Sequence, residues 1–295
     1  DLAQLVAEGD RLAFSTDSYV IDPLFFPGGN IGKLAICGTA NDVAVSGAIP
    51  RYLSCGFILE EGLPMETLKA VATSMAETAR AAGIAIVTGD TKVVQRGAAD
   101  KLFINTAGMG AIPANIHWGA QTLTAGDVLL VSGTLGDHGA TILNLREQLG
   151  LDGELVSDCA VLTPLIQTLR DIPGVKALRD ATRGGVNAVV HEFAAACGCG
   201  IELSEAALPV KPAVRGVCEL LGLDALNFAN EGKLVIAVER NAAEQVLAAL
   251  HSHPLGKDAA LIGEVVERKG VRLAGLYGVK RTLDLPHAEP LPRIC

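Results

Sequence analysis

The fold is decided by a stretch in the first third of the chain, Ile84-Ala85-Ile86-Val87-Thr88-Gly89-Asp90-Thr91-Lys92. Its first four residues are apolar, which predicts a buried strand. An amphipathic segment at 65–82 precedes it and ends at Gly83, as helices often do. A helix that leads directly into a strand indicates an α/β fold. Such folds bind ligands at the carboxyl ends of strands, so Asp90 is expected at a site, with a plain Gly-Asp turn as the alternative.

Helices and strands alternate along the rest of the chain as well. The first part is predicted to contain strands at 11–21, 51–59, 84–87 and 102–110 and helices at 31–45 and 65–82. After a polar break at 113–125, the second part is predicted to contain strands at 128–131, 200–204, 234–238, 260–266 and 271–276 and helices at 139–149, 159–171, 185–196, 213–221 and 242–251. We therefore expect two mixed-sheet α/β (α+β) domains, at 1–118 and 119–280, followed by a mobile tail at 281–295.

Composition restricts the classes of function. The chain has 295 residues, of which 49% are hydrophobic, enough for one large core or two ordinary ones. The net charge of −9 argues against a nucleic-acid partner, and no apolar run reaches the roughly 18 residues that a membrane span needs. The cysteines lie mostly in apolar stretches, which is typical of reduced thiols in a cytoplasmic protein. Because the chain opens at Asp1, partway through an element, we expect a further segment before it.

Two aspartates in the first part of the chain stand where an acid is costly. Asp17 lies inside the predicted strand at 11–21, between Thr16 and Ser18, and Asp42 continues the apolar face of the following helix. A buried carboxylate needs a cation or hydrogen-bond donors. Each aspartate is therefore explained either by a bound cation or by a local hydrogen bond. For Asp17 the local explanation is a turn or helix cap, and for Asp42 it is a buried hydrogen bond.

The second part adds two polar motifs next to predicted elements. Asp180-Ala181-Thr182-Arg183-Gly184-Gly185 leads into a helix whose free N–H groups suit a phosphate, with Asp180 as a metal ligand or as an N-cap. Asn230-Glu231-Gly232-Lys233 precedes a strand and either presents Glu231 at a site or forms a plain turn. Mg²⁺ prefers carboxylates together with phosphate oxygens. The summed motifs therefore indicate Mg-ATP chemistry.

The chain ends in a cysteine, Cys295, beyond three prolines within seven residues. A thiol is the best nucleophile among side chains at neutral pH. Prolines keep a segment extended at roughly 3.1 Å per residue. The tail therefore fits an arm that carries a chemical group between sites, and a frayed terminus that happens to end in cysteine is the alternative.

Taken in order, these motifs resemble the aminoimidazole-ribonucleotide-synthetase-like (PurM/selenophosphate synthetase) superfamily. The matching segments are Thr16-Asp17-Ser18, Phe25-Phe26-Pro27-Gly28-Gly29-Asn30-Ile31-Gly32-Lys33, Asn41-Asp42-Val43-Ala44, Thr88-Gly89-Asp90-Thr91-Lys92 and Asp180-Ala181-Thr182-Arg183-Gly184-Gly185. The terminal Pro292-Arg293-Ile294-Cys295 is similar to one family within it, the carbamoyl dehydratases (HypE) of [NiFe]-hydrogenase maturation. The resemblance covers essentially the whole chain. The superfamily has a glycine-rich segment before the position of Asp1, so a complete ATP site is not implied by these residues.

The resemblance implies a two-domain subunit that forms a homodimer through its N-terminal sheets and holds ATP and Mg²⁺ in a groove of the first domain. It implies ATP-dependent dehydration of a carbamoyl group on Cys295, from thiocarboxamide to thiocyanate, which supplies cyanide ligands for the hydrogenase iron. It also implies two partners, a carbamoyltransferase, HypF, that loads the thiol and a HypC–HypD iron scaffold that receives the cyanide.

Roles follow from the same resemblance, residue by residue. The expected Mg²⁺ ligands are Asp17, Asp42, Asp90 and Asp180. The expected ATP contacts are Thr16, Asp17, Ser18, Asp42, Thr88, Gly89, Asp90, Thr91, Lys92 and Arg183. Lys92 is expected to neutralise phosphate or polarise the carbonyl, and Glu231 to act as the base. His138 is a weaker candidate for the base, with a structural role as the alternative, and Arg293 is expected to favour the Cys295 thiolate.

Two rival interpretations remain at this point. The first is another ATP-using enzyme of the superfamily, such as selenophosphate synthetase, thiamine monophosphate kinase or the purine-pathway cyclo-ligase. These enzymes would share the aspartates but have no use for a terminal cysteine. The second is a non-catalytic scaffold whose proline-rich tail docks into a partner's groove.

Overall fold

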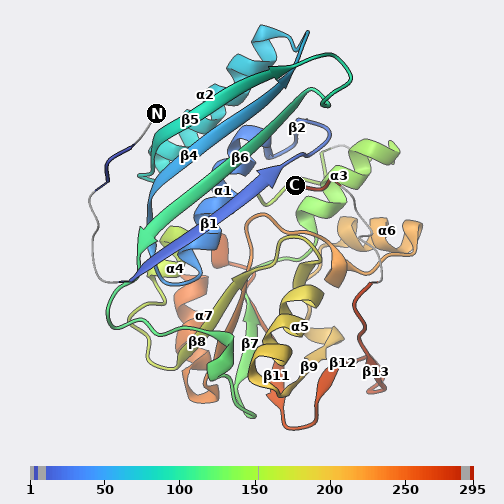
Figure 1. Ribbon diagram of the computed structural model, residues 1–295. Helices are drawn as coiled ribbons and strands as arrows, with labels where there is room; N and C mark the ends of the chain where they lie inside the picture. The colour runs from blue at the N-terminus through green and yellow to red at the C-terminus, as the bar shows by residue number, and fades with distance from the viewer. Residues whose placement is uncertain (1–2, 6–10, 152, 287–292) are drawn as a thin grey trace.

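The computed structural model describes residues 3–5, 11–151, 153–286 and 293–295. A four-stranded sheet built from the first part of the chain lies beside a seven-stranded sheet built from the second part (Figure 1). The described end of the chain, at Cys295, lies near β2 and α3, between the two sheets. This mixed α/β architecture with two sheets is the predicted fold class.

The four-stranded sheet has the order β1-β6-β4-β5. Its strands are β1 (Leu12–Tyr19), β4 (Ile49–Glu60), β5 (Ala85–Val94) and β6 (Leu102–Ala111), and only β4 and β5 run parallel. The short strands β2 (Phe25–Phe26) and β3 (Gly29–Asn30) form a separate hairpin before α1 (Ile31–Ala44). Asn30 caps α1, since its side chain accepts hydrogen bonds from the backbone N–H groups of Gly32 and Lys33.

One face of this sheet is covered and the other is open in the single chain. Helices α1 and α2 (Met65–Ala81) pack against the covered face and against each other. On β1 the alternation places Tyr19 inside and leaves Phe14, 70% exposed, on the open face. Ile58 of β4 is also exposed there. The open face therefore carries apolar side chains that the described residues leave exposed.

The seven-stranded sheet has the order β13-β12-β9-β11-β7-β10-β8. Its strands are β7 (Val128–Val131), β8 (Val175–Asp180), β9 (Gly200–Ser204), β10 (Leu234–Val238), β11 (Ala260–Val266), β12 (Gly270–Ala274) and β13 (Lys280–Thr282). Apolar side chains of α5 (Gly185–Cys197) cover one face, and those of α4 (Thr163–Gln167) and α7 (Ala243–His251) cover the other. Every residue of β7 and β10 is buried as a result. Helices α3 (Asp137–Glu147) and α6 (Pro212–Leu221) lie nearer the first sheet.

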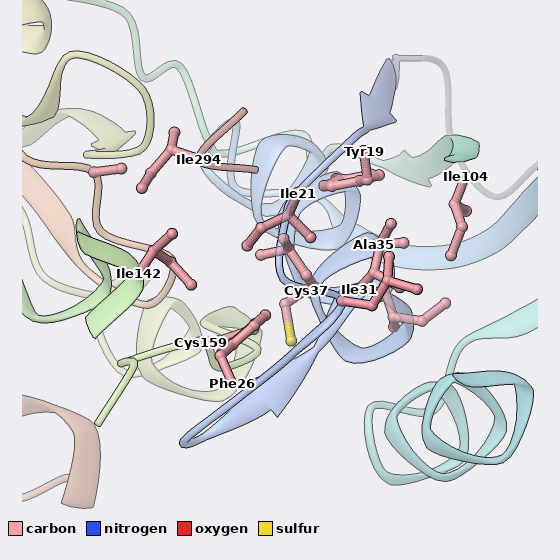
Figure 2. Packing of buried hydrophobic residues seen from close by; sticks show 14 of the residues in the cluster. Tyr19, Ile21, Phe26, Ile31, Ala35, Cys37, Ile104, Ile142, Cys159 and Ile294 are labelled. Atoms are coloured by element: carbon pink, nitrogen blue, oxygen red, sulfur yellow. The ribbon is translucent and has the colours of Figure 1, made fainter. Parts of the chain in front are cut away.

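One hydrophobic cluster joins the two parts of the chain. It includes Tyr19 and Ile104 from the first sheet, Ile142 from α3, and Ile294 from the tail, which is only 1% exposed (Figure 2). The last three residues are thus docked into the core, and β13 with the buried Leu283 occupies the start of the predicted tail. Mobility of the segment 281–295 stays a prediction, and residues 287–292 lie outside the described part.

Three sequence-based boundaries are corrected. The strand predicted at 84–87 continues to Val94 as β5, so the Gly-Asp-Thr-Lys segment is strand and not a turn. Strand β8 was not predicted at all, and the helix predicted at 159–171 is reduced to α4. In the described residues, no helix combines the length and apolar character that a membrane crossing requires.

Candidate active site

A pocket between the two sheets collects half of the predicted site residues. It is lined by Asp17, Ser18, Tyr19, Gly38, Asp42, Arg179, Asp180, Thr182, Arg183, Glu231 and Cys295. These residues come from β1, α1, the end of β8, the segment before β10, and the end of the tail. Residues that are as far apart as 17 and 295 in sequence therefore share one cavity.

Asp17 and Asp42 approach each other on the first-domain side of the pocket. Asp17 lies on the inner face of β1, opposite the buried Thr106, and Asp42 lies near the end of α1. Ser15 Oγ donates to Asp42 Oδ2 at 2.7 Å. Burial, together with the charge and the hydrogen bond of Asp42, raises the pKa of Asp17 to about 6.

The end of β8 supplies an acid and a cation from the second domain. Asp180 is 3% exposed, and burial, assisted by the negative charge of Asp42, raises its pKa to about 7. Arg179 Nη1 lies 3.3 Å from Asp42 Oδ1 and 3.4 Å from Asp180 Oδ1, so it bridges the two carboxyl groups. This guanidinium joins the two domains across the pocket.

Glu231 reaches the pocket from a rigidly held turn. Asp158, whose side chain is 2% exposed, accepts the backbone N–H groups of Glu231 at 3.0 Å and of Gly232 at 3.2 Å, and it pairs with Lys233 at 3.3 Å. Glu231 itself is 2% exposed, and burial among acidic neighbours raises its pKa well above the usual value. Burial therefore disfavours the charged carboxylate of Glu231, and an entering cation would favour it.

Cys295 enters the pocket because the tail is held at several points. Its carbonyl accepts the backbone N–H of Val20 at 3.0 Å, and its Sγ lies 3.1 Å from Arg183 Nη2. A guanidinium at that distance favours the thiolate, which is the nucleophilic form of the thiol. The expectation that Arg293 has this role is wrong here, because Arg293 Nη1 pairs with Asp100 at 2.6 Å and its Nε donates to the Val20 carbonyl at 2.9 Å.

Asp90 and Lys92 do not line this pocket. The register pairs Gly56 with Asp90 and the exposed Ile58 with Lys92, which places both side chains on the open face of the sheet. They form an exposed ion pair with each other at 2.9 Å. The structure therefore does not bring Asp90 together with Asp17, Asp42 and Asp180 within one subunit, because Asp90 lies outside the pocket that the other three line.

The other expected ATP contacts are also divided. Thr88, Gly89 and Thr91 line, with Asp90, a separate open depression next to α2. Thr16 Oγ1 donates to the Thr106 carbonyl, on the neighbouring strand, at 3.1 Å. Ser18, Asp42 and Arg183 remain in the pocket with Cys295.

His138 is buried outside the pocket. Its Nε2 lies 2.7 Å from the carbonyl oxygen of Ile294, and its Nδ1 lies 2.7 Å from Ser157 Oγ. Burial lowers the pKa of His138, so the ring is neutral at neutral pH. With both nitrogens occupied and no place in the pocket lining, it contacts the tail backbone and not the reacting end.

Two residues that contact Asp42, Arg179 in the pocket lining and Ser15 beside it, were missed from the sequence. Arg179 belongs to β8, which the sequence did not reveal because charged residues interrupt its apolar pattern. Ser15 looked like an ordinary strand residue. A signal was present in Arg179-Asp180, since a cation next to an acid at a strand end is typical of a polar site.

The pocket fits a hard cation only in part. In the described residues no three His, Cys, Asp or Glu side chains are grouped closely enough to hold a metal ion as they stand. However, Oε1 of Glu231 is buried without a hydrogen-bond partner among the described residues, and Oδ1 of Asp180 is also buried without a hydrogen bond there, although it lies 3.4 Å from Arg179 Nη1. Unsatisfied carboxyl oxygens of this kind suit Mg²⁺, which binds oxygen ligands and keeps several waters.

Comparison with known proteins identifies the family. The model of the AIR synthase related protein, N-terminal domain, matches residues 1–112, and that of its C-terminal domain matches 124–275. The chain is 99% identical over 295 residues to the carbamoyl dehydratase HypE of Escherichia coli (strain K12), which covers all of this chain and 88% of that protein. The chain belongs to the HypE family. HypE proteins are similar throughout, and that of Rhodobacter capsulatus is 49% identical over 99% of this chain and 87% of its own length.

Solved HypE structures share the fold over nearly the whole chain. A crystal structure of E. coli HypE, described as a hydrogenase maturation protein, superposes with a TM-score of 0.97 at 98% identity, over 100% of this chain and 92% of that one. A HypE in complex with ATP gives 0.96 at 46% identity, over 100% and 90%. A HypE–HypF complex gives 0.91 at 47% identity, over 93% and 90%. A ThiL complexed with AMPPCP and TMP, 21% identical with a TM-score of 0.71, shares the fold alone.

Proposed function

We propose that this protein is an ATP-dependent carbamoyl dehydratase that converts a thiocarboxamide on Cys295 to a thiocyanate. The observation that carries the proposal is the position of Cys295, whose Sγ contacts Arg183 in the pocket that also contains Asp17, Asp42, Asp180 and Glu231. Family membership and the ATP complex of a HypE relative support the use of ATP. The product would supply cyanide ligands for the iron of [NiFe]-hydrogenase.

The reaction needs ATP because the carbamoyl oxygen leaves poorly. In Cys295-S-C(=O)-NH₂ the carbonyl oxygen attacks the γ-phosphoryl group, and ADP departs. The nitrogen then loses its two protons as the C–O bond breaks, which gives Cys295-S-C≡N and inorganic phosphate. The carbamoyl oxygen therefore ends in the phosphate.

The side chains of the pocket can be given distinct tasks. Asp17, Asp42 and Asp180 would hold Mg²⁺, which supplies charge neutralisation for phosphate oxygens when bound. Arg183 would hold the sulfur end of the group, and Arg179 would keep Asp42 and Asp180 in place. Glu231 would accept a proton from nitrogen, because an entering cation stabilises its ionised form.

Asp90 and Lys92 would act across a homodimer. They lie on the open sheet face together with apolar side chains such as Phe14 and Ile58. Pairing of two such faces would cover these apolar groups. It would also bring Asp90 and Lys92 of one subunit towards the nucleotide of the other. Thr88, Gly89, Thr91 and Thr16 would then complete the ATP contacts.

Partners follow from the chemistry of the tail. The HypE–HypF complex among the relatives supports HypF as the carbamoyltransferase that loads the thiol. We further propose that a HypC–HypD scaffold receives the cyanide. All seven cysteines are free in the structure, which supports a reducing cytoplasmic location.

Mass spectrometry of the C-terminal peptide tests the proposal. The protein is incubated with HypF, carbamoyl phosphate and the ATP that HypF needs, freed of nucleotide, and then supplied with fresh ATP or with buffer. We expect gain of a carbamoyl group on Cys295, followed by loss of water only in the sample with fresh ATP. Loss of water in buffer alone, or a carbamoyl group on another residue, would refute the proposed reaction. Cys295→Ala serves as the control, since it should bind ATP but accept no carbamoyl group.

A further inference from the structure

The position of the sulfur depends on the residue before it. Ile294 is 1% exposed and packs in the core with Tyr19 and Ile142. Figure 2 shows its side chain directed into this cluster, across from α3. Because Cys295 follows directly, fixing the Ile294 backbone fixes the place at which Sγ meets Arg183.

A directed chain of hydrogen bonds reaches the Ile294 carbonyl. A carbonyl oxygen only accepts, so Nε2 of His138 must carry its proton and donate to Ile294 O at 2.7 Å. Nδ1 is then the acceptor, and the Ser157 hydroxyl must donate to it at 2.7 Å. The Ser157 oxygen in turn accepts the backbone N–H of Cys159 at 3.2 Å. Every proton in this chain is therefore assigned by the partners.

The surroundings of His138 leave the ring little freedom. It is fully buried, and the ring of Phe26 lies edge-on at 5.4 Å between centroids. Ser157 is held as well, since its N–H donates to the Pro27 carbonyl at 2.9 Å. A Cβ on Gly28, which has a φ of +96°, would collide with the Ser157 backbone. The Phe25–Gly29 segment, which no step of the reaction uses, thus supports the His138–Ser157 pair.

The remaining tail contacts are less buried. Arg293 pairs with Asp100 through side chains that are 38% and 44% exposed, and Arg146 donates to the Arg293 carbonyl in a partly buried position. Exposed ion pairs contribute little, whereas breaking a buried hydrogen bond leaves an unpaired polar group. Among the described side-chain hydrogen bonds of residues 293–295, the His138–Ile294 bond is the one that is buried, so its loss is expected to weaken docking most.

We propose that His138 is a positioning residue, a latch that holds the Ile294 carbonyl and so keeps the Cys295 sulfur in the pocket. Its release would free the thiol for carbamoyl transfer, and its closure would return the loaded thiol for dehydration. The inference rests on the proposed function for the meaning of the docked state. The docking itself can be tested without any chemistry on the carbamoyl group.

Carboxypeptidase Y trimming, followed by intact mass, measures release of the tail directly. When opening is fast, the trimming rate follows the population of the undocked end. We expect His138→Leu to raise the rate roughly 5- to 100-fold, because it removes a hydrogen-bond donor from a buried carbonyl. His138→Gln, whose amide can donate from nearly the place of Nε2, should restore a rate near wild type. His251→Gln is the matched control, since His251 bonds the Ala259 carbonyl far from the tail.

Two further measurements make the test decisive. Ser157→Ala leaves the imidazole ring in place but removes the donor to Nδ1, so it should also raise the trimming rate. If His138→Leu does not fold, the trimming rate of Ser157→Ala tests the latch in its place. In the HypF assay, His138→Leu should load carbamoyl at least as fast as wild type but lose water more slowly, with His138→Gln restored. Trimming at the wild-type rate in a folded His138→Leu protein would overturn the latch. Failure of wild type to dehydrate would instead refute the proposed function and leave the trimming result valid.

Discussion

At the level of single residues, three acids of the pocket have pKa values that are raised above the usual range. Burial raises the pKa of Asp17 to about 6 and that of Asp180 to about 7, and that of Glu231 lies well above the usual value. Raised pKa values mean that the charged carboxylates are disfavoured in the empty pocket, and an arriving cation would stabilise them.

The raised pKa of Asp180 predicts that the stability of the folded protein depends on pH. Its pKa is raised from 3.8, so between about pH 4 and 7 the folded protein keeps a proton that the unfolded chain has lost. Stability from this group is therefore present at low pH and is lost as pH rises through the folded pKa. We expect Asp180→Asn to raise Tm by roughly 5 °C at pH 8 but by much less at pH 5, measured without divalent cations. The exposed Asp171→Asn is the control, and a Tm difference that does not change with pH would contradict this account.

Some of these residues could be recognised from sequence and others could not. Asp17 and Asp42 were identifiable from the sequence because an acid within an apolar pattern is costly to bury unless a cation or hydrogen-bond donor contacts it. Arg179 and Ser15 were not, since their importance comes from contacts with Asp42 that only the fold creates. For His138 the sequence left open a weak base candidate and a structural role, and it could not reveal that both ring nitrogens have hydrogen-bond partners.

At the level of elements, the turn into α5 positions the second-domain half of the pocket. Gly185 begins the helix with a φ of +60°, and a Cβ there would lie under 3.0 Å from the carbonyl oxygens of Leu226 and Phe228. The loop between Asp180 and Gly185 contributes both Thr182 and Arg183 to the pocket. A backbone shift at Gly185 would therefore move the guanidinium that contacts the sulfur.

Gly185→Ala is expected to lower both stability and activity. The strained φ and the backbone collision should cost about 2 kcal/mol or more of unfolding free energy. Gly216→Ala in α6 is the matched control, because its Cβ meets nothing within 4 Å and alanine should stabilise the helix by about 0.5–1 kcal/mol. Urea denaturation of both variants checks this, and equal midpoints for the two would show that the turn is not constrained.

Most strong elements were predictable from their patterns, and the exceptions have physical causes. Strands β7, β9, β10 and β11 were predicted with their observed boundaries because they are continuous apolar or alternating runs. Strand β8 was hidden because Lys176 and Arg179 interrupt it, and these side chains pair with Asp127 and Asp42 in the fold. In β5 the Gly89-Asp90 pair looked like a turn, but pairing with β4 carries the strand through it.

At the level of the whole molecule, the open sheet face gives the dimer proposal a sharp test. If Asp90 of one subunit serves the pocket of the other, Asp90→Asn and Asp42→Asn should each be inactive alone. After unfolding and refolding a mixture, half of the dimers would be mixed and each would contain one intact site. We expect recovery of about a quarter of wild-type dehydration. No recovery, in a mixture shown to contain mixed dimers, would place Asp90 outside the shared site.

The arrangement of the tail lay beyond sequence reasoning. The terminal cysteine was recognisable as a carrier from its position and its prolines. Its docking depends on Val20, His138, Arg146 and Arg183, which come from four separate segments. Such long-range contacts have no local signature in a single sequence.

An oxygen-18 experiment tests most directly the claim that ATP activates the carbamoyl oxygen on Cys295. The thiol is loaded with a carbamoyl group that carries ¹⁸O in its carbonyl, unbound nucleotide is removed, and unlabelled ATP is added in unlabelled water. The account predicts one ¹⁸O atom in the inorganic phosphate for each thiocyanate formed on the tail. Appearance of the ¹⁸O in water, with unlabelled phosphate, would contradict it.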